Sequence, residues 1–274
     1  WGAADRYHAV DQLAANRDAK HGGSRAASEL ADLLKQYDPE LRQRVERAFK
    51  QWNPIIRDYL RTETALRLSV GEDTRSVPVV VADVLPRPFE AVISNLLGDA
   101  WLLLNRPLIE QTLRGLTLID TRYDEMTNWT PFQSPATRDE VQHVGEYAKR
   151  LADLVQNLEL LKRIGQIDQD ILGAYFFRVP KVDLYWMVIG VLAATLGVSA
   201  EALTVVVLAH ELAHAYTHVG RDIDGERWNT EAFARTELEI VEGLAQFYTA
   251  VVCKRLELRM PAAKEAYTRL LKLQ

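Results

Sequence analysis

The chain has 274 residues, 48% of them apolar and 26% charged, which excludes disordered and fibrous classes and allows one large domain or two modest ones. Its formal net charge of -5 gives no overall electrostatic signature of a protein that binds nucleic acid or anionic lipid. Cys253 is the only cysteine, so a secreted disulfide framework is excluded and a reducing compartment is favoured.

The sequence carries no pattern typical of a targeting or membrane segment. It opens without a charged and then apolar leader, and its most apolar stretch, residues 188–209, is interrupted by glycine, serine and glutamate. Such interruptions make a poor membrane span. We therefore expect a soluble, cytoplasmic protein with no membrane partner.

The first half of the chain is expected to be mainly helical. Leucine and aromatic residues recur at helical spacing through residues 25–60, with an interruption at residues 38–39, which predicts two amphipathic helices. A β-branched run at residues 79–81 predicts a short strand. The apolar segment 89–118 predicts one or two buried helices, and residues 121–135 lack periodicity and predict a loop or linker.

A capping box and a hairpin follow. Thr137 and Glu140 have the spacing of a capping box and predict a helix that runs to about residue 164. Residues 171–177 and 179–185 predict two short strands around a turn.

Helices dominate the remainder. The helical pattern continues to residue 196, and Gly197 and Ser199 are typical of one helix ending and the next beginning. We expect that next helix at residues 200–219 and another at residues 236–256.

A His-Glu-x-x-His motif, formed by His210, Glu211 and His214, lies on the predicted helix 200–219. Residues four apart lie nearly one above the other on a helix, so both imidazoles can reach one metal ion. Glu211 is rotated by about 100° from His210 and is placed to accept a proton from an activated water. The preceding apolar run predicts a buried helix, on which these polar groups would be costly without a metal.

The motif resembles that of the zincin metallopeptidases. The metzincin branch requires a glycine three residues after the second histidine and a third histidine after six, but Thr217 and Gly220 stand there. His218 lies about 12 Å along the helix from His210, at ~1.5 Å per residue, so it cannot share the same ion. We expect a helix-end histidine near the negative end of the helix dipole.

The gluzincin branch supplies its third ligand from a later helix, and the resemblance implies Glu242 in this role. Glu239 and Asp222 stay open as alternatives. The small residues Gly243 and Ala245 would let the two helices pack closely.

Glu239 and Gln246 fall on the same helical face as Glu242 and are candidate hydrogen-bond partners of a ligating histidine.

The resemblance also implies a substrate-binding edge strand before the active-site helix. The strand that contains Tyr175 and Phe176 would present an exposed edge to an extended peptide. Zincins of this branch stabilise the oxyanion with a group outside the metal site, and the candidates are Tyr248, Tyr175, His218 and Arg235.

Together these features predict an α+β, predominantly helical fold. Residues 131–274 are expected to form a zincin-like metallopeptidase domain, with a small sheet or hairpin before its active-site helix, after a mainly helical region at residues 1–130. The expected activity is hydrolysis of peptides or proteins with one Zn²⁺ per chain. The alternatives are a non-catalytic, zinc-stabilised binding or regulatory protein that acts through its N-terminal helices, and a zinc hydrolase of non-peptide amides.

Overall fold

The protein is described here from a computed structural model, in residues 25–68, 77–87, 89–90, 104–127, 137–157 and 171–272. Helices dominate, and three strands form one small sheet, as expected for a predominantly helical α+β fold. The named elements in chain order are α2 (Arg25–Tyr37), α3 (Leu41–Thr64), β1 (Val79–Ala82), α6 (Arg106–Thr127), α7 (Arg138–Asn157), β2 (Gly173–Phe176), β3 (Lys181–Tyr185), α9 (Trp186–Leu196), α10 (Ala200–Val219), α11 (Thr230–Arg235), α12 (Leu238–Leu256) and α13 (Pro261–Leu271).

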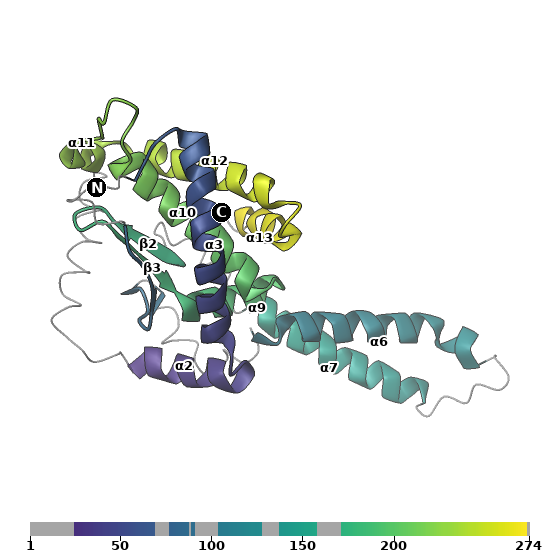
Figure 1. Ribbon diagram of the computed structural model, residues 1–274. Helices are drawn as coiled ribbons and strands as arrows, with labels where there is room; N and C mark the ends of the chain where they lie inside the picture. The colour runs from purple at the N-terminus through teal and green to yellow at the C-terminus, as the bar shows by residue number, and fades with distance from the viewer. Residues whose placement is uncertain are drawn as a thin grey trace.

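Helix α10 lies at the centre of the fold, and α3, α9, α12, α13 and the β2–β3 hairpin pack around it (Figure 1). Gly197, with a φ of 64°, ends α9, and the Ser199 hydroxyl accepts the N–H of Ala202 at 3.2 Å to cap α10. Nearly all residues of α10 are buried, which confirms the buried helix predicted from its apolar sequence. No helix in the described parts of the chain is long and apolar enough to cross a bilayer.

Helix α3 packs along α10 through one apolar face. The buried residues of that face recur every three or four positions and are Leu41, Val45, Ala48, Trp52, Ile56 and Leu60. At the start of α10, Arg44 donates two hydrogen bonds of 2.7 Å to the carboxylate of Glu201, and this bidentate ion pair joins the two helices. The pairing lowers the pKa of Glu201.

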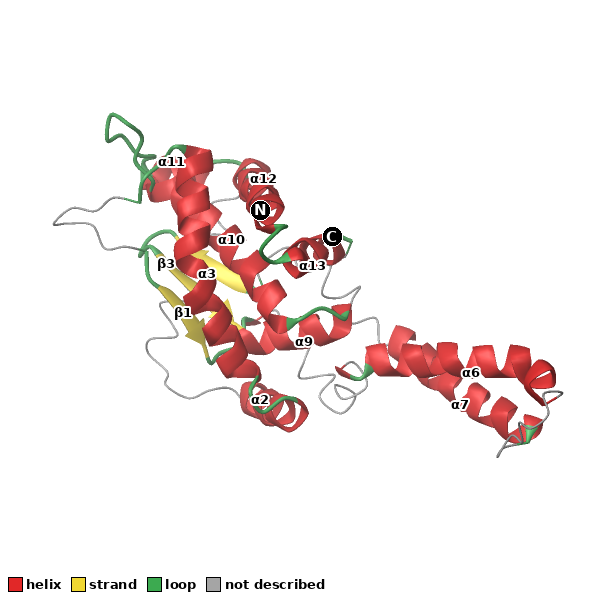
Figure 2. Ribbon diagram, turned by 45° about the vertical axis from the view of Figure 1, so that its right-hand side comes forward, coloured by secondary structure: helices red, strands yellow, loops and turns green. Residues whose placement is uncertain are grey.

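The sheet, drawn in yellow in Figure 2, has the strand order β1-β3-β2, so β2 lies at one edge. β2 and β3 form the predicted antiparallel hairpin, whereas β1 pairs in parallel with β3 across about a hundred residues of chain. Helix α3 and strand β1, on one side of residue 130, therefore share one hydrophobic core with the elements on its other side. The proposed boundary at residues 130–131 itself lies outside the described residues.

Helices α6 and α7 lie side by side and extend away from the rest of the fold (Figures 1 and 2). The capping box before α7 is confirmed, since the N–H of Thr137 donates to the Glu140 carboxylate at 2.7 Å and the N–H of Glu140 donates to the Thr137 hydroxyl at 3.3 Å. Helix α7 is described to Asn157, so its predicted end near residue 164 lies outside the described residues.

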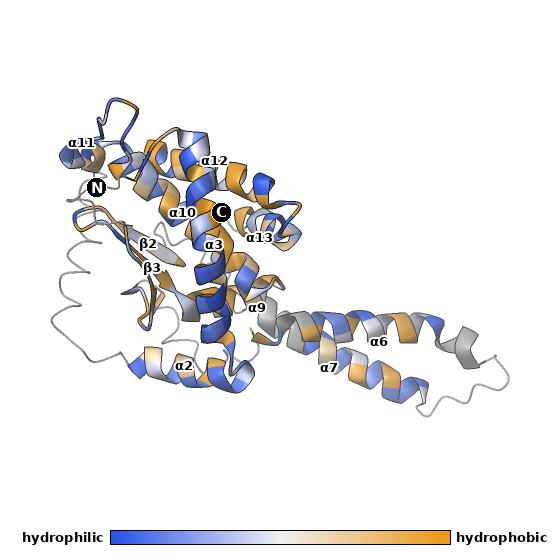
Figure 3. Cartoon of the chain, in the orientation of Figure 1, coloured by the Kyte–Doolittle hydropathy of each residue, from blue (hydrophilic) through white to orange (hydrophobic). Residues whose placement is uncertain are grey.

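Two predictions for the α6 region were wrong in part. Of the buried helices predicted at residues 89–118, Phe89 and Leu104 are buried, and residues 91–103 lie outside the described residues. The described side chains between residues 108 and 119 are exposed or half-buried, and Leu108 and Leu118 are 59% and 55% exposed. The reason is that α6 packs mainly against the single helix α7 (Figure 3 shows the hydropathy of both). Residues 121–127 continue α6, where a loop was predicted at residues 121–135, and the rest of that range lies outside the described residues. The short helix α11 was not predicted from the sequence.

We predict that Gly190→Ala destabilises the protein by about 1–2 kcal/mol, because a Cβ at Gly190 in α9 would lie 2.4 Å from Cδ2 of the buried Leu41. Overpacking costs roughly 1–3 kcal/mol, more than the ~1 kcal/mol that alanine gains over glycine in a helix. The matched variant Gly243→Ala meets no atom within 4 Å and should be stabilised by about 0.5–1 kcal/mol. Urea unfolding of both variants is the measurement, and equal stabilities would contradict the prediction.

Candidate metal centre

Two neighbouring helices bring together three side chains that could hold a metal ion. His210 and His214 lie one helical turn apart on α10, and their Nε2 atoms are 3.2 Å apart. Helix α12 packs against α10 and carries Glu242, whose two carboxylate oxygens lie 3.3 Å from His210 Nε2 and 3.5 Å from His214 Nε2. Within the described residues, no other group of three or more histidine, cysteine or acidic side chains converges in this way.

The surroundings keep the Glu242 carboxyl ionised. Burial by itself would raise its pKa, but hydrogen bonds with His210 and His214 and their charge hold the pKa of Glu242 well below its usual range. The Glu242 side chain is 32% exposed and that of His214 is 4% exposed. The cluster therefore has one face open to solvent and one face in the core.

The donor set fits a zinc ion. Two imidazole nitrogens and one carboxylate are typical of catalytic zinc sites, which keep a fourth position for water or substrate. Zinc–ligand bonds of about 2.0–2.1 Å in a tetrahedral arrangement separate the ligand atoms by roughly 3.3 Å. The three separations between His210, His214 and Glu242, 3.2 to 3.5 Å, are close to this value.

The two alternative third ligands lie elsewhere. Glu239 is exposed at the start of α12 and is not part of the converging group. Asp222 lies in an exposed loop, where its Oδ1 accepts the backbone N–H groups of Asp224 at 3.0 Å and Glu226 at 2.9 Å. Its role there is to order a turn. The expected packing role of Gly243 is also wrong, because Gly243 is exposed with open space beside it.

Glu211 lies on the core side of α10, 2% exposed, against strand β2. A Cβ at Gly173 would lie 2.8 Å from Glu211 Cγ and 3.0 Å from its Oε1. The carboxylate therefore occupies its place only because β2 has no side chain at that position. Gly173 was not predicted from the sequence, although a glycine inside a strand often marks such a close approach.

Along β2, the backbone N–H and C=O groups of successive residues point alternately toward β3 and toward the outer edge of the sheet. The N–H of Tyr185 donates to the carbonyl of Leu172 at 3.0 Å, which fixes the alternation of the antiparallel ladder. Gly173 and Tyr175 direct their N–H and C=O groups away from β3, and Phe176 directs its groups toward β3. All four residues of β2 are buried, so the prediction of an exposed edge strand was wrong in its exposure but not in its edge position.

His218 is buried in the last turn of α10, and its role is not that of a charged histidine at a helix end. Burial, together with the charge of Arg227, lowers the pKa of His218 to about 4, so it is neutral near pH 7. Its Nδ1 lies 2.8 Å from the Tyr175 hydroxyl and its Nε2 lies 3.2 Å from the Thr230 hydroxyl. Its ring stacks on Phe233 with centroids 4.4 Å apart.

The candidates for oxyanion stabilisation are now separated in space. The ring of Tyr175 lies parallel to that of His214, with centroids 6.5 Å apart, so Tyr175 borders the metal-binding group. Arg235 is exposed at the end of α11 and pairs with Glu231 at 3.8 Å. Tyr248 is half-buried on α12 and packs against Phe247.

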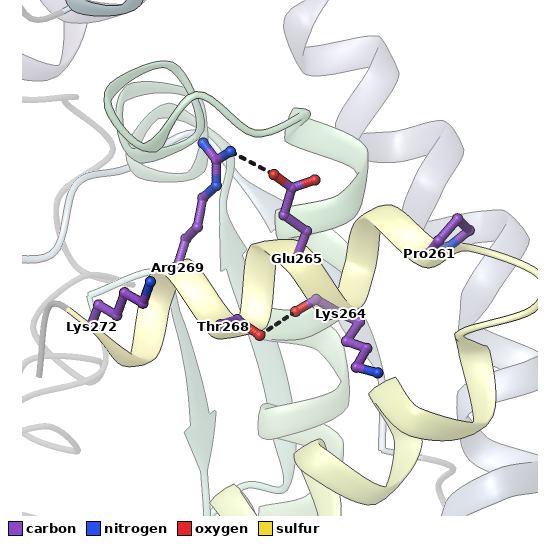
Figure 4. Close-up of a pocket in the computed structure, with 6 residues that line it drawn as sticks. All are labelled: Pro261, Lys264, Glu265, Thr268, Arg269 and Lys272. Carbon is purple, nitrogen blue, oxygen red and sulfur yellow. Dashed lines mark hydrogen bonds and ion pairs between the residues drawn. The ribbon is translucent and has the colours of Figure 1, made fainter.

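The pocket in Figure 4 lies along α13 and contains none of the metal-binding side chains. Its lining residue Arg269 pairs with Glu265 at 2.5 Å and donates to the carbonyl of Leu196 at 2.6 Å. Arg269 thus caps the C-terminal carbonyls of α9, so its place in this pocket has a structural role.

Comparisons of the chain with protein-family models, with curated proteins and with solved structures gave no match.

We predict that Glu242→Ala lowers the affinity for Zn²⁺ by at least about 10-fold, because it removes one of three converging ligands. Glu239→Ala is the matched control, since Glu239 is an exposed glutamate one turn earlier on α12. Competition with a zinc-binding dye measures both affinities. A loss in Glu239→Ala without a loss in Glu242→Ala would show that the third ligand is misassigned.

Proposed function

We propose that the protein is a zinc-dependent hydrolase that cleaves peptide bonds, with one Zn²⁺ held by His210, His214 and Glu242. The convergence of these three side chains from α10 and α12 is the observation that carries the proposal. A site that only stabilises the fold is normally closed by four protein ligands, whereas three ligands leave a position for chemistry. This ligand set and Glu211 are also what the resemblance to the gluzincin metallopeptidases implies.

The reaction divides between the metal and the protein. Zinc, when bound, supplies a Lewis acid that polarises a carbonyl and lowers the pKa of water. Glu211 accepts the proton of the attacking water and returns it to the leaving nitrogen, so it acts first as base and then as acid. Its neighbour Gly173 leaves the space in which the carboxylate lies.

The edge position of β2 supports a peptide as the substrate. Gly173 and Tyr175 direct their backbone groups to the outer edge, and their side-chain positions lie against Glu211 and His214 respectively. An extended peptide that pairs with this edge would place its main chain beside the same two residues of α10. Within the described residues, no other strand pairs with this edge.

We predict that Glu211→Gln binds Zn²⁺ normally but turns over peptides roughly 10² to 10⁴ times more slowly, since glutamine cannot accept the proton. Mass spectrometry of a mixed peptide library measures turnover, and metal analysis measures zinc content. Glu239→Gln is the control and should keep full activity. Equal activity of Glu211→Gln and the wild type would remove Glu211 from the mechanism. A zinc-loaded wild type without any turnover would support the non-catalytic alternative.

We predict that Gly173→Ala also lowers turnover, by about 10- to 100-fold, with zinc content unchanged. The added methyl would lie 2.8 Å from both Glu211 Cγ and Val207 Cγ1, and a displaced catalytic group costs rate steeply. The control Gly145→Ala meets no atom within 4 Å and should be fully active. Unchanged turnover in Gly173→Ala would show that the position of Glu211 does not depend on this contact.

A further inference from the structure

The third histidine of α10 has surroundings unlike those of the first two. His210, His214 and His218 follow one another at four-residue spacing and therefore lie along one face of the helix. His218 is 0% exposed and lies outside the group that includes Glu242. It meets the hydroxyl of Tyr175 on one ring nitrogen and the hydroxyl of a threonine of α11 on the other.

Tyr175 lies between the last two of these histidines. Its ring is parallel to that of His214 within 8°, with centroids 6.5 Å apart, and it meets the ring of His218 edge-on at 5.9 Å. These separations lie within the range in which aromatic rings attract one another. Strand β2 fixes the base of the tyrosine, and the contact with His218 fixes its hydroxyl, so the ring is held at both ends.

One arrangement of hydrogen atoms gives each donor an acceptor in the hydrogen-bonded chain of Tyr175, His218 and Thr230. Burial raises the pKa of Tyr175 and lowers that of His218 to about 4, so both are neutral near pH 7. A neutral imidazole donates from one nitrogen and accepts at the other. With Tyr175 donating to Nδ1, Nε2–H donates to the Thr230 hydroxyl. The reverse order would leave the buried phenol hydrogen in need of another acceptor.

We infer that Tyr175 is a positioning residue for His214, and that His218 holds Tyr175 in place. The inference rests on the zinc site proposed above. A histidine ligand binds a metal best when its ring is already oriented toward the metal. The ring of Tyr175 borders the His214 imidazole and would limit the positions open to it, and the hydrogen bond to His218 holds Tyr175 beside it.

Two substitutions test the inference from opposite sides. Tyr175→Phe keeps the ring and removes the hydroxyl. His218→Phe keeps an aromatic ring against Phe177 and Phe233 and removes the acceptor. Each should raise the Kd for Zn²⁺ by about 10-fold, and the double variant should be no weaker than either single variant, because both break the same link. The visible spectrum of the Co²⁺-loaded protein should change in both, which reports on metal geometry without activity.

Tyr216→Phe is the matched control. Tyr216 is a buried tyrosine of the same helix, and its hydroxyl donates a bond of equal length, 2.8 Å, to the carbonyl of Arg57 in α3. It should lose comparable stability and keep the wild-type Kd and Co²⁺ spectrum. Thermal unfolding shows which variants are folded.

Wild-type Zn²⁺ affinity and Co²⁺ spectrum in either folded variant would overturn the inference and leave the zinc site standing. The same holds if losses in the two single variants add in the double variant, or if Tyr216→Phe loses as much affinity. A wild-type protein that binds neither ion would overturn the proposed function itself.

Discussion

The structure depends on how α10 satisfies the polar side chains that it carries into the core. Glu211, His214 and His218 are each 3% exposed or less on a helix that is otherwise almost entirely apolar. A buried polar group without a partner costs about 1–3 kcal/mol, so each of these side chains limits what can pack beside it. The elements around α10 supply partners to its histidines, with Glu242 beside His210 and His214 and with Tyr175 and Thr230 beside His218. Within the described residues, Oε2 of Glu211 is buried without a hydrogen-bond partner.

The two sides of α10 consequently have different neighbours. Helix α3 lies along it with an apolar face and an ion pair at one end. Helix α12 and strand β2 lie beside the residues of the candidate metal centre, and β2 does so with its smallest and one of its largest residues, Gly173 and Tyr175. Gly173 approaches Glu211, and the ring of Tyr175 lies beside that of His214. The N-terminal helices are likewise divided, since α3 belongs to the core whereas α6 extends from it with α7 (Figure 1).

The Glu242 carboxylate pairs directly with the imidazoles of His210 and His214, and this pairing places the three candidate ligands near each other. Charge and geometry act in the same direction, because the interaction that keeps Glu242 ionised also holds His210 and His214 toward one point. Much of the entropy of ordering these side chains is therefore lost on folding and not on binding of a ligand.

The sequence by itself determined the features that depend on neighbours along the chain. The period of 3.6 residues places His210 and His214 on one face, and local caps and apolar patterns predict the bounds of α10, the start of α7 and the hairpin. The family resemblance suggested Glu242, which the fold brings to the two histidines. Only the tertiary structure decided the parallel pairing of β1 with β3, the exposure of α6, the approach of Gly173 to Glu211 and the contact of Tyr175 with His218. The last contact joins residues 43 positions apart, and no periodic pattern encodes it. Such contacts depend on how the faces of separate elements pack, whereas periodicity and capping depend only on the backbone geometry of a single element.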